Sequence, residues 1–278
     1  MPRHRIAAKF RELRARDETA LIPYVVAGDP DLDTTKAIVR EFVARGADLI
    51  ELGVPFSDPM ADGPANQRAA SRGLNAGASL AAILSMVSEL RRETEIPIIL
   101  FGYFNPIFHY GCDRLCADAA RAGIDGLLVV DLPPEEAGEL KTAARANGLD
   151  IIYLLAPTTP IERARKVARS ASGFLYYISV LGVTGARTVV ASDLKEYVNN
   201  LRGVTDLPIG VGFGISTPEQ AARIARFADA VVVGSALSLL IEANLGSTDL
   251  VKKVGELVGS MKLAMKASRV KTDGAEAS

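Results

Sequence analysis

Three carboxylates gather in one short stretch of the chain, residues 49–67, which reads LIELGVPFSDPMADGPANQ. Glu51 follows an apolar pair, whereas Asp58 and Asp62 lie among prolines and glycines. The pattern predicts Glu51 near the carboxyl end of a short buried strand and both aspartates on the following loop. Parallel α/β enzymes hold their catalytic groups at that end of the strand. Two carboxylates in different surroundings can hold different pKa values, so one can act as an acid and the other as a base.

Each of these carboxylates also has a purely structural interpretation. An aspartate in a loop rich in proline and glycine often caps a turn or a helix, and this alternative is strongest for Asp58. It is weaker for Glu51, because a charge inside the apolar run LIELG faces a buried environment. Buried charges are rare unless they are paired or used.

Glycine-rich turns late in the chain predict a phosphate site. The sequence GFGIS at 212–216 follows one strand-like run, and Gly234 and Ser235 follow the next run and open a helix at Ala236–Ala243. Glycine lets backbone N–H groups approach phosphate oxygens, and the helix end adds positive partial charge. The predicted contacts are Gly214, Gly234 and Ser235, although two tight turns that bind nothing would show the same pattern.

The segment 179–190, SVLGVTGARTVV, is rich in glycine, serine and threonine and follows another strand-like run. Its length and composition predict a lid over the site, in which Gly185 would meet the phosphate. An ordinary surface loop is the alternative.

The elements that must position these residues are short apolar runs that alternate with amphipathic helical stretches. Because the runs are continuous rather than alternating, they predict strands buried on both faces of a parallel sheet. Eight strands are predicted, at Ala20–Val26, Asp48–Leu52, Pro97–Phe101, Gly126–Val130, Ile151–Leu155, Phe174–Ser179, Pro208–Gly212 and Ala230–Gly234. The helices between them are predicted at Thr34–Arg45, Leu80–Glu93, Asp113–Ala122, Glu135–Asn147, Ile161–Ser170, Ser192–Leu201 and Pro218–Phe227.

Eight such units predict an α/β fold, a (β/α)8 TIM barrel, in a single domain over residues 1–270. The alternative is a doubly wound sheet, which the count of eight and the lack of a G-x-G-x-x-G in the first βα turn disfavour. An extra N-terminal helix within Arg3–Arg14 is expected to close the barrel bottom. The polar segment 271–278 is expected to be a disordered tail.

The composition excludes several classes of protein. Of the 278 residues, 49% are hydrophobic and 23% charged, and the net charge of −1 gives no general attraction to nucleic acid or to an anionic membrane. The only cysteines, Cys112 and Cys116, are spaced for helix packing rather than a disulfide, and with two histidines they give a metal site little support. With no signal peptide and no apolar run of about 18 residues, a cytoplasmic protein is expected.

The first stretch also resembles the signature of the tryptophan synthase alpha subunit family, L-[IV]-E-[LI]-G-[VI]-P-[FY]-S-D-P-x-A-D-G-P. All sixteen positions are met at 49–64. The likeness extends along the barrel, to Pro23, the Gly28-Asp29-Pro30 turn, Tyr103-Phe104-Asn105-Pro106, Asp131-Leu132-Pro133, Tyr176, Gly182-Val183-Thr184-Gly185, Gly212-Phe213-Gly214-Ile215-Ser216 and Gly234-Ser235.

The resemblance implies a TIM barrel that cleaves indole-3-glycerol phosphate to indole and glyceraldehyde 3-phosphate, in tryptophan biosynthesis and without a cofactor. By position in the motif, Glu51 would protonate the indole at C3 and take the proton of the glycerol 3′-hydroxyl. Asp62 would hold the indole N–H, and Tyr176 and Thr184 would position Asp62. An indole needs an apolar wall, for which the candidates are Tyr24, Phe101 and Tyr103.

The resemblance also implies a partner, a pyridoxal-phosphate-dependent beta subunit that receives the indole, in an α2β2 complex. The expected interface residues are Pro55, Asp58, Pro59, Asn105, Pro106, Phe108 and Asp131. The loop FNPIFHY supports this surface if Phe104, Ile107 and Phe108 are exposed, because an apolar loop tip is costly on a monomer. The alternative is that these side chains fold back onto the barrel.

Other functions stay open from the sequence alone. A different phosphosugar or indole-glycerol-phosphate barrel enzyme would be expected to place a catalytic lysine at a strand end, and no predicted strand contains one. A stand-alone indole-producing lyase and a largely non-catalytic activator of the beta subunit are the two remaining alternatives.

Overall fold

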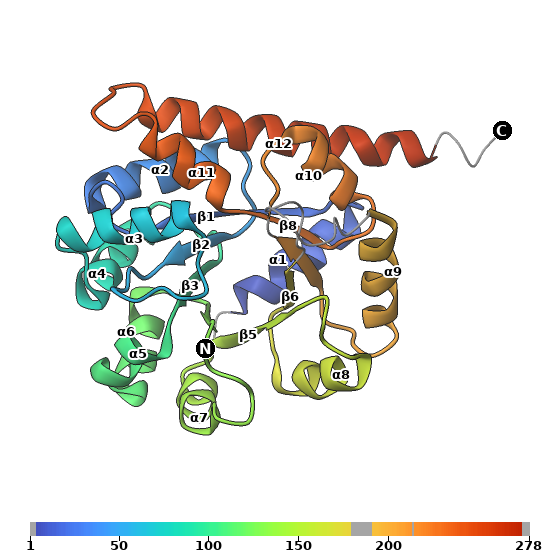
Figure 1. Cartoon of the computed structure of the whole chain (residues 1–278), viewed down its shortest axis with the longest axis horizontal. Coiled ribbons are helices and arrows are strands. Elements are labelled where there is room, and N and C mark those ends of the chain that lie inside the picture. Colours follow the sequence, from blue (N-terminus) through green and yellow to red (C-terminus); the bar gives the residue numbers. More distant parts are fainter. Residues whose placement is uncertain (1–3, 179–190, 213, 274–278) are drawn as a thin grey trace.

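The computed structural model describes residues 4–178, 191–212 and 214–273, and these form a closed barrel of eight parallel strands in sequence order (Figure 1). Each strand pairs with its neighbours in the chain, and β8 closes the ring on β1. The strands are β1 Ala20–Val26, β2 Ile50–Gly53, β3 Ile98–Gly102, β4 Gly126–Val129, β5 Asp150–Leu155, β6 Leu175–Ile178, β7 Ile209–Gly212 and β8 Ala230–Val233. The predicted (β/α)8 TIM barrel is confirmed.

The helices surround this ring of strands (Figure 1). They are α1 Arg5–Ala15, α2 Leu32–Ala44, α3 Pro64–Asn75, α4 Leu80–Leu90, α5 Phe104–Tyr110, α6 Cys112–Ala122, α7 Gly138–Ala146, α8 Ile161–Ser170, α9 Ala191–Arg202, α10 Pro218–Ala225, α11 Ser235–Glu242 and α12 Leu250–Asp273. The longest of them, α12, packs against α2 and α10. Among the described residues no single helix is long and apolar enough to cross a membrane, and only the bent pair α3 and α4 passes on length and composition together.

The N-terminal helix α1 closes the bottom of the barrel, as predicted. Its buried side chains, such as Ile6 and Phe10, belong to the same apolar cluster as the interior residues Ile99 and Leu128. The Phe10 ring centroid lies 5.7 Å from that of Phe174, the residue directly before β6. Because the amino end of the barrel is filled in this way, the open site must lie at the carboxyl ends of the strands.

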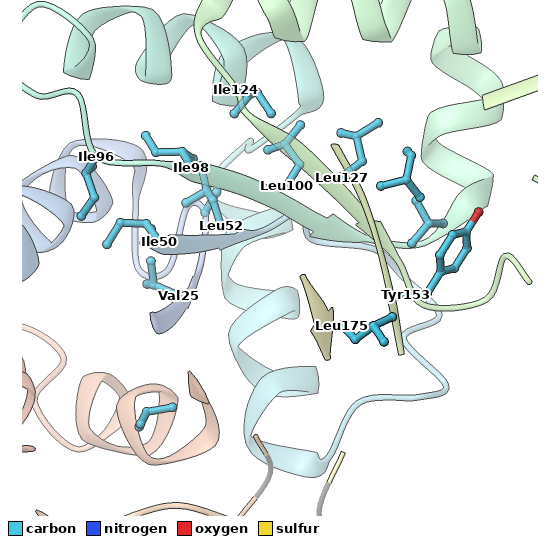
Figure 2. Close-up of a cluster of buried hydrophobic side chains, with 14 of the residues drawn as sticks. Val25, Ile50, Leu52, Ile96, Ile98, Leu100, Ile124, Leu127, Tyr153 and Leu175 are labelled. Carbon is cyan, nitrogen blue, oxygen red and sulfur yellow. The ribbon is translucent and has the colours of Figure 1, made fainter. Parts of the chain in front are cut away.

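A second apolar cluster fills the layer between the strands and the helices, and Figure 2 shows part of it. Ile50 and Leu52 of β2 belong to this layer. Side chains alternate between the two faces of a strand, so Glu51 between them faces the barrel interior. The alternation of side chains along β2 therefore places the Glu51 carboxyl group in the barrel interior.

Local sequence signals predict the start of one helix correctly and of another wrongly. Thr217 caps α10 in a capping box with Gln220, with Pro218 in the first turn, as the sequence indicates. The predicted start of the seventh helix at Glu135 is wrong, because residues 134–136 form a turn and α7 begins at Gly138. The Glu135 carboxylate pairs instead with Arg163 of α8, with 2.8 Å between Oε2 and Nη2.

Helices α3, α5 and α12 are absent from the prediction. The first begins at Pro64 inside a segment rich in small and polar residues, and the second is only seven residues long. The third extends through Asp273, three residues into the predicted tail, and residues 274–278 lie outside the described part of the chain.

Candidate active site

Glu51 is the most unusual carboxyl group of the barrel interior. It lies within β2, and only 1% of its surface is exposed. Its Oε1 atom is buried and has no hydrogen-bond partner among the described residues. Burial raises the pKa of Glu51 from 4.5 to about 8, since the charged form is desolvated and no cation in the described part of the chain offsets this. The side chain is therefore mainly protonated at neutral pH and able to give up a proton.

A cavity of about 230 Å³ opens beside Glu51 at the carboxyl ends of the strands. It brings together residues that the sequence predicted separately: the carboxyl groups of Glu51 and Asp62, the wall residues Tyr24 and Phe101, Tyr176, and the turns at Gly214, Gly234 and Ser235. The lining of the cavity thus combines two acidic groups, a set of apolar side chains and two glycine-rich turns. This arrangement suits a ligand with an aromatic body and an anionic end.

Asp62 lies on the loop after β2 and directly before Gly63, the N-cap residue of α3. The Tyr103 hydroxyl donates to Oδ2 of Asp62 at 2.8 Å, and Nδ2 of Asn66 donates to Oδ1 at 3.5 Å. Burial raises the pKa of Asp62, and these two donors partly offset the rise. Among the described residues no lysine or arginine pairs with Asp62. Its carboxylate would therefore be free to meet a positive charge on a ligand.

Tyr24 and Phe101 form the predicted apolar wall. Their ring centroids lie 5.1 Å apart in an edge-to-face arrangement, and both residues line the cavity. Tyr103, the third predicted wall residue, has a different place, because its hydroxyl holds Asp62 and its ring lies 5.5 Å from that of Phe56.

Tyr176 makes no hydrogen bond to Asp62 within the described residues, and its predicted role in positioning Asp62 stays a prediction. Tyr176 belongs to β6, which lies opposite β2 in the ring of eight. Its hydroxyl occupies the space that a side chain at Gly212 would fill. Burial raises the pKa of Tyr176 well above its ordinary value, and the nearby Glu51 adds to the shift. Tyr176 thus forms a neutral far wall of the cavity.

The two glycine-rich turns lie side by side at the carboxyl ends of β7 and β8. Gly214 has φ of +73°, a conformation that other residues adopt at a cost. Gly234 is the N-cap residue of α11, and no side chain caps this helix. Its first backbone N–H groups are thus left for an anion. Thr184 and Gly185 fall within 179–190, outside the described residues, so their roles stay predictions.

The residues of the expected partner surface differ in exposure. Asp58, Asn105, Phe108 and Asp131 are exposed, whereas Pro59 and Pro106 are half-buried and Pro55 is buried. Pro55 and Pro106 both line a groove of about 450 Å³. The expectation that Ile107 is exposed is wrong: it packs into the apolar layer, and Phe104 is half-buried against the same layer. Only Phe108, with 62% of its surface exposed, remains as an apolar tip of this loop.

Several residues of the site were not predicted. Val130, Leu154, Ile178 and Val232 line the cavity at the ends of four strands. Each lies two residues after an interior side chain of its strand, as Leu154 follows Ile152, so the strand alternation carries this signal. No such periodic signal marks Asn66 or Met60. Met60 lies two residues before Asp62 and is 91% exposed. No group of three His, Cys, Asp or Glu side chains in the described chain is arranged to hold a metal ion.

Comparison with known proteins agrees with this geometry. The family model of the tryptophan synthase alpha chain matches residues 10–266. A tryptophan synthase alpha chain from Citrifermentans bemidjiense is 56% identical over 266 residues, covering 95% of this chain and 99% of the relative. Another, from Gluconacetobacter diazotrophicus, is 57% identical over 242 residues, covering 87% of this chain and 88% of the relative.

Solved structures of this family superpose closely. The alpha subunit of tryptophan synthase from Legionella pneumophila matches with a TM-score of 0.88 at 42% identity, covering 95% of this chain and 98% of the other. A tryptophan synthase chain from M. tuberculosis matches with a TM-score of 0.84 at 33% identity, covering 94% and 99%. The protein therefore belongs to the tryptophan synthase alpha chain family.

Proposed function

We propose that the protein is the alpha subunit of a tryptophan synthase and cleaves indole-3-glycerol phosphate to indole and glyceraldehyde 3-phosphate. The observation that carries this proposal is the buried carboxyl group of Glu51, whose Oε1 atom has no hydrogen-bond partner among the described residues and which shares one cavity with Asp62 and with the turn at Gly234. The proton donor, the anionic stabiliser and the anion cradle are the parts that a retro-aldol cleavage of this substrate requires.

The chemistry begins at the indole ring. The bond between C3 and the glycerol chain cannot break while the ring is aromatic there, so a proton must first add to C3. Glu51 is suited to donate it, because a carboxyl group with a pKa of about 8 is protonated at neutral pH. Protonation leaves a positive charge at the indole nitrogen, which the Asp62 carboxylate would stabilise.

The second half of the reaction runs in the opposite direction. Glu51, now a carboxylate, would accept the proton of the 3′-hydroxyl, whose oxygen becomes the carbonyl oxygen of glyceraldehyde 3-phosphate. The electrons of the broken carbon–carbon bond return to the ring and restore the aromatic indole. One residue thus serves as acid and then as base. Because burial brings its pKa close to neutral pH, the protonated and ionised forms of Glu51 lie close in free energy.

The decisive experiment is direct. The purified chain, with and without a tryptophan synthase beta subunit, is incubated with indole-3-glycerol phosphate, and the release of indole is measured. Formation of indole and glyceraldehyde 3-phosphate in equal amounts is expected. Intact substrate under both conditions would rule out the lyase function. Beta-subunit activation without substrate cleavage would instead support the non-catalytic alternative.

A lysine-dependent barrel enzyme is disfavoured by the structure as well as the sequence. None of the eight observed strands contains a lysine. Lys262, a buried lysine of α12, is bound to the Asp48 carboxylate at 2.7 Å, at the amino end of β2. It lies away from the cavity and cannot form a covalent intermediate there.

The phosphate cradle leads to a prediction about affinity. Replacing Gly214 with leucine should raise KM for indole-3-glycerol phosphate roughly tenfold or more, equivalent to about 1.4 kcal/mol of lost binding, because a side chain would fill the approach to the turn. Steady-state kinetics would measure this change. The matched control is Gly246→Leu, since Gly246 also has a positive φ of +76° and no atom within 4 Å of its Cβ position. Equal effects of both substitutions would argue against the cradle.

A beta subunit is the partner that membership of the family implies. We propose an α2β2 complex in the cytoplasm, with docking around Asp58, Pro59 and Phe108. The exposure of Phe108 and of Met60, which directly precedes the cavity residues Ala61 and Asp62, supports this surface, since large exposed apolar side chains are typical of an interface. Pro55, Asn105, Pro106 and Asp131 complete the proposed docking residues.

Partner binding should change the rate of cleavage. We expect the isolated chain to turn over slowly and the beta subunit to raise kcat by one to two powers of ten, roughly 1–3 kcal/mol of coupling. The measurement is indole release at increasing beta-subunit concentration. Phe108→Ala should raise the beta-subunit concentration that gives half-maximal activation. It should not change the activity of the isolated chain. Equal rates with and without the partner would favour the stand-alone lyase.

A further inference from the structure

A chain of polar contacts joins the helix of the phosphate cradle to Asp62. Ser238 lies one turn into α11 with 2% of its surface exposed, and its hydroxyl donates to Oδ1 of Asn66 at 2.8 Å. Asn66 lies in the first turn of α3, four residues after Asp62, and its Nδ2 donates to Oδ1 of Asp62 at 3.5 Å. Three side chains thus span from α11 to the catalytic loop.

The two hydrogen bonds define one orientation of the Asn66 side-chain amide. An asparagine side chain has one acceptor oxygen and one donor nitrogen. Because the Ser238 hydroxyl donates to the oxygen, the Asn66 nitrogen is turned toward Asp62. The reversed amide would place its oxygen against the Asp62 carboxylate, where two acceptors repel. The Ser238 hydroxyl, as donor, and the Asp62 carboxylate, as acceptor, are thus both satisfied by the same orientation of the Asn66 amide.

The two helices are also clamped farther from the cavity. The Nε and Nη2 atoms of Arg68 donate to the carboxylate of Glu242 in α11, at 2.7 and 2.8 Å. Arg72 contacts Glu242 at 3.2 Å and binds the buried Asp29 carboxylate with two bonds, at 2.7 and 2.9 Å. These ion pairs hold α3 against α11 and against the turn after β1. The longest contact in the system is the one between Asn66 and Asp62.

The contact at the other end of the chain leads to the phosphate turn. The backbone N–H of Ser238 donates to the carbonyl oxygen of Gly234 at 3.2 Å. Gly234 and Ser235 are the residues whose N–H groups face a bound anion in the proposed function. A small shift of this first turn on phosphate binding would therefore move Ser238 and, through it, the amide of Asn66.

We propose that Asn66, oriented by Ser238, is a positioning residue that tightens on Asp62 when a phosphate group occupies the N-terminus of α11. Phosphate binding thereby improves the stabilisation of the charge on the indole ring. The inference rests on the proposed function and adds that the phosphate of the substrate contributes to the chemical step as well as to binding. A hydrogen bond to an ionised group is worth more than a neutral one, so a modest shortening has a measurable effect.

The test compares two substrates of the full-length chain. The first is indole-3-glycerol phosphate, and the second is indole-3-glycerol, which lacks the phosphate. Asn66→Ala and Ser238→Ala should each lower kcat for the phosphorylated substrate about fivefold to twentyfold. Both variants should lower kcat/KM for indole-3-glycerol less than they lower it for the phosphorylated substrate, because the contact between Asn66 and Asp62 is loose when the cradle is empty. KM for the phosphorylated substrate should change little.

A second measurement uses inorganic phosphite as the probe. Phosphite added to indole-3-glycerol should accelerate its cleavage by the wild-type chain, and this activation should be lost in Asn66→Ala and in Ser238→Ala. The matched control is Ser88→Ala, because the Ser88 hydroxyl of α4 donates only to a backbone oxygen, that of Leu84, at 3.0 Å. This control should keep both the activity and the phosphite activation.

The outcomes separate the two proposals. Equal losses on the two substrates, or full activity of both variants with the phosphorylated one, would overturn the linkage while leaving the lyase function in place. A wild-type chain that cleaves neither substrate, with or without a beta subunit, would overturn the proposed function and this inference together. Should Asn66→Ala fail to fold, Asn66→Leu, which keeps nearly the size of the side chain and removes the donor without adding a charge beside Asp62, takes its place and should show the same loss.

Discussion

The Glu51→Gln variant is expected to lose cleavage of indole-3-glycerol phosphate by at least about a hundredfold, because a glutamine cannot transfer the proton. The amide has nearly the size of the carboxyl group, so the substrate should still bind. Steady-state indole release gives kcat, and protection of the chain by substrate in thermal unfolding reports binding. Retention of more than about a tenth of the wild-type kcat would remove Glu51 from the central role.

The same variant has a pH signature. Burial raises the pKa of Glu51 from 4.5 to about 8 in the folded chain. Wild-type kcat/KM should therefore fall as the pH rises above about 8, where the acid is lost. The folded state also binds the proton more tightly than the unfolded chain, so this group stabilises the fold below pH 4.5, and that contribution disappears as the pH rises through about 8.

In Glu51→Gln this pH-dependent contribution to stability should be absent. The variant should consequently be at least as stable as the wild type above pH 8, which shows that lost activity is not lost folding. The matched control is Glu256→Gln, because Glu256 is an exposed glutamate of α12. It should change neither the kcat nor the pH dependence of unfolding.

The barrel was predictable because its signals are local and repeated. The apolar run at Ala20–Val26 and the glycine-bounded run before Gly53 each fix a buried strand by composition alone. Eight such runs in alternation with helices leave few topologies. The start of α7 was mispredicted, because the acidic pair after Pro134 resembles a first helical turn, whereas Glu135 is in fact recruited by Arg163 from another helix.

The site was predictable at residues whose type is energetically unfavourable in its position unless it has a function. Glu51 in an apolar strand and glycines before a helix start are such residues, and the cavity brings them together. The partners of Asp62 were not predictable, because they depend on which helices meet. Tyr103 reaches Asp62 from the end of β3, and Asn66 receives its orientation from α11, 172 residues away in the chain. Only the closed barrel places those groups side by side.

Asp62→Asn should lower kcat by about a hundredfold or more, roughly 2.7 kcal/mol of lost stabilisation, because a neutral amide cannot balance the positive charge that forms at the indole nitrogen. Asp58→Asn is the matched control: Asp58 lies four residues earlier on the same loop, but its carboxylate is exposed and accepts a hydrogen bond from Ser57. The control should keep its activity within about twofold in the isolated chain.

The pH dependence distinguishes a charge-stabilising Asp62 from a merely structural one. Burial raises the pKa of Asp62, and the Tyr103 hydroxyl works against that rise. The reaction needs the ionised form, so activity should fall on the acidic side as Asp62 takes up a proton. Tyr103→Phe removes a donor to the carboxylate and should move this acidic limb to higher pH, while Asp62→Asn should abolish it. If Asp58→Asn proved the more damaging substitution, or if the acidic limb stayed in place in Tyr103→Phe, the charge at the indole nitrogen would have to be balanced by another group.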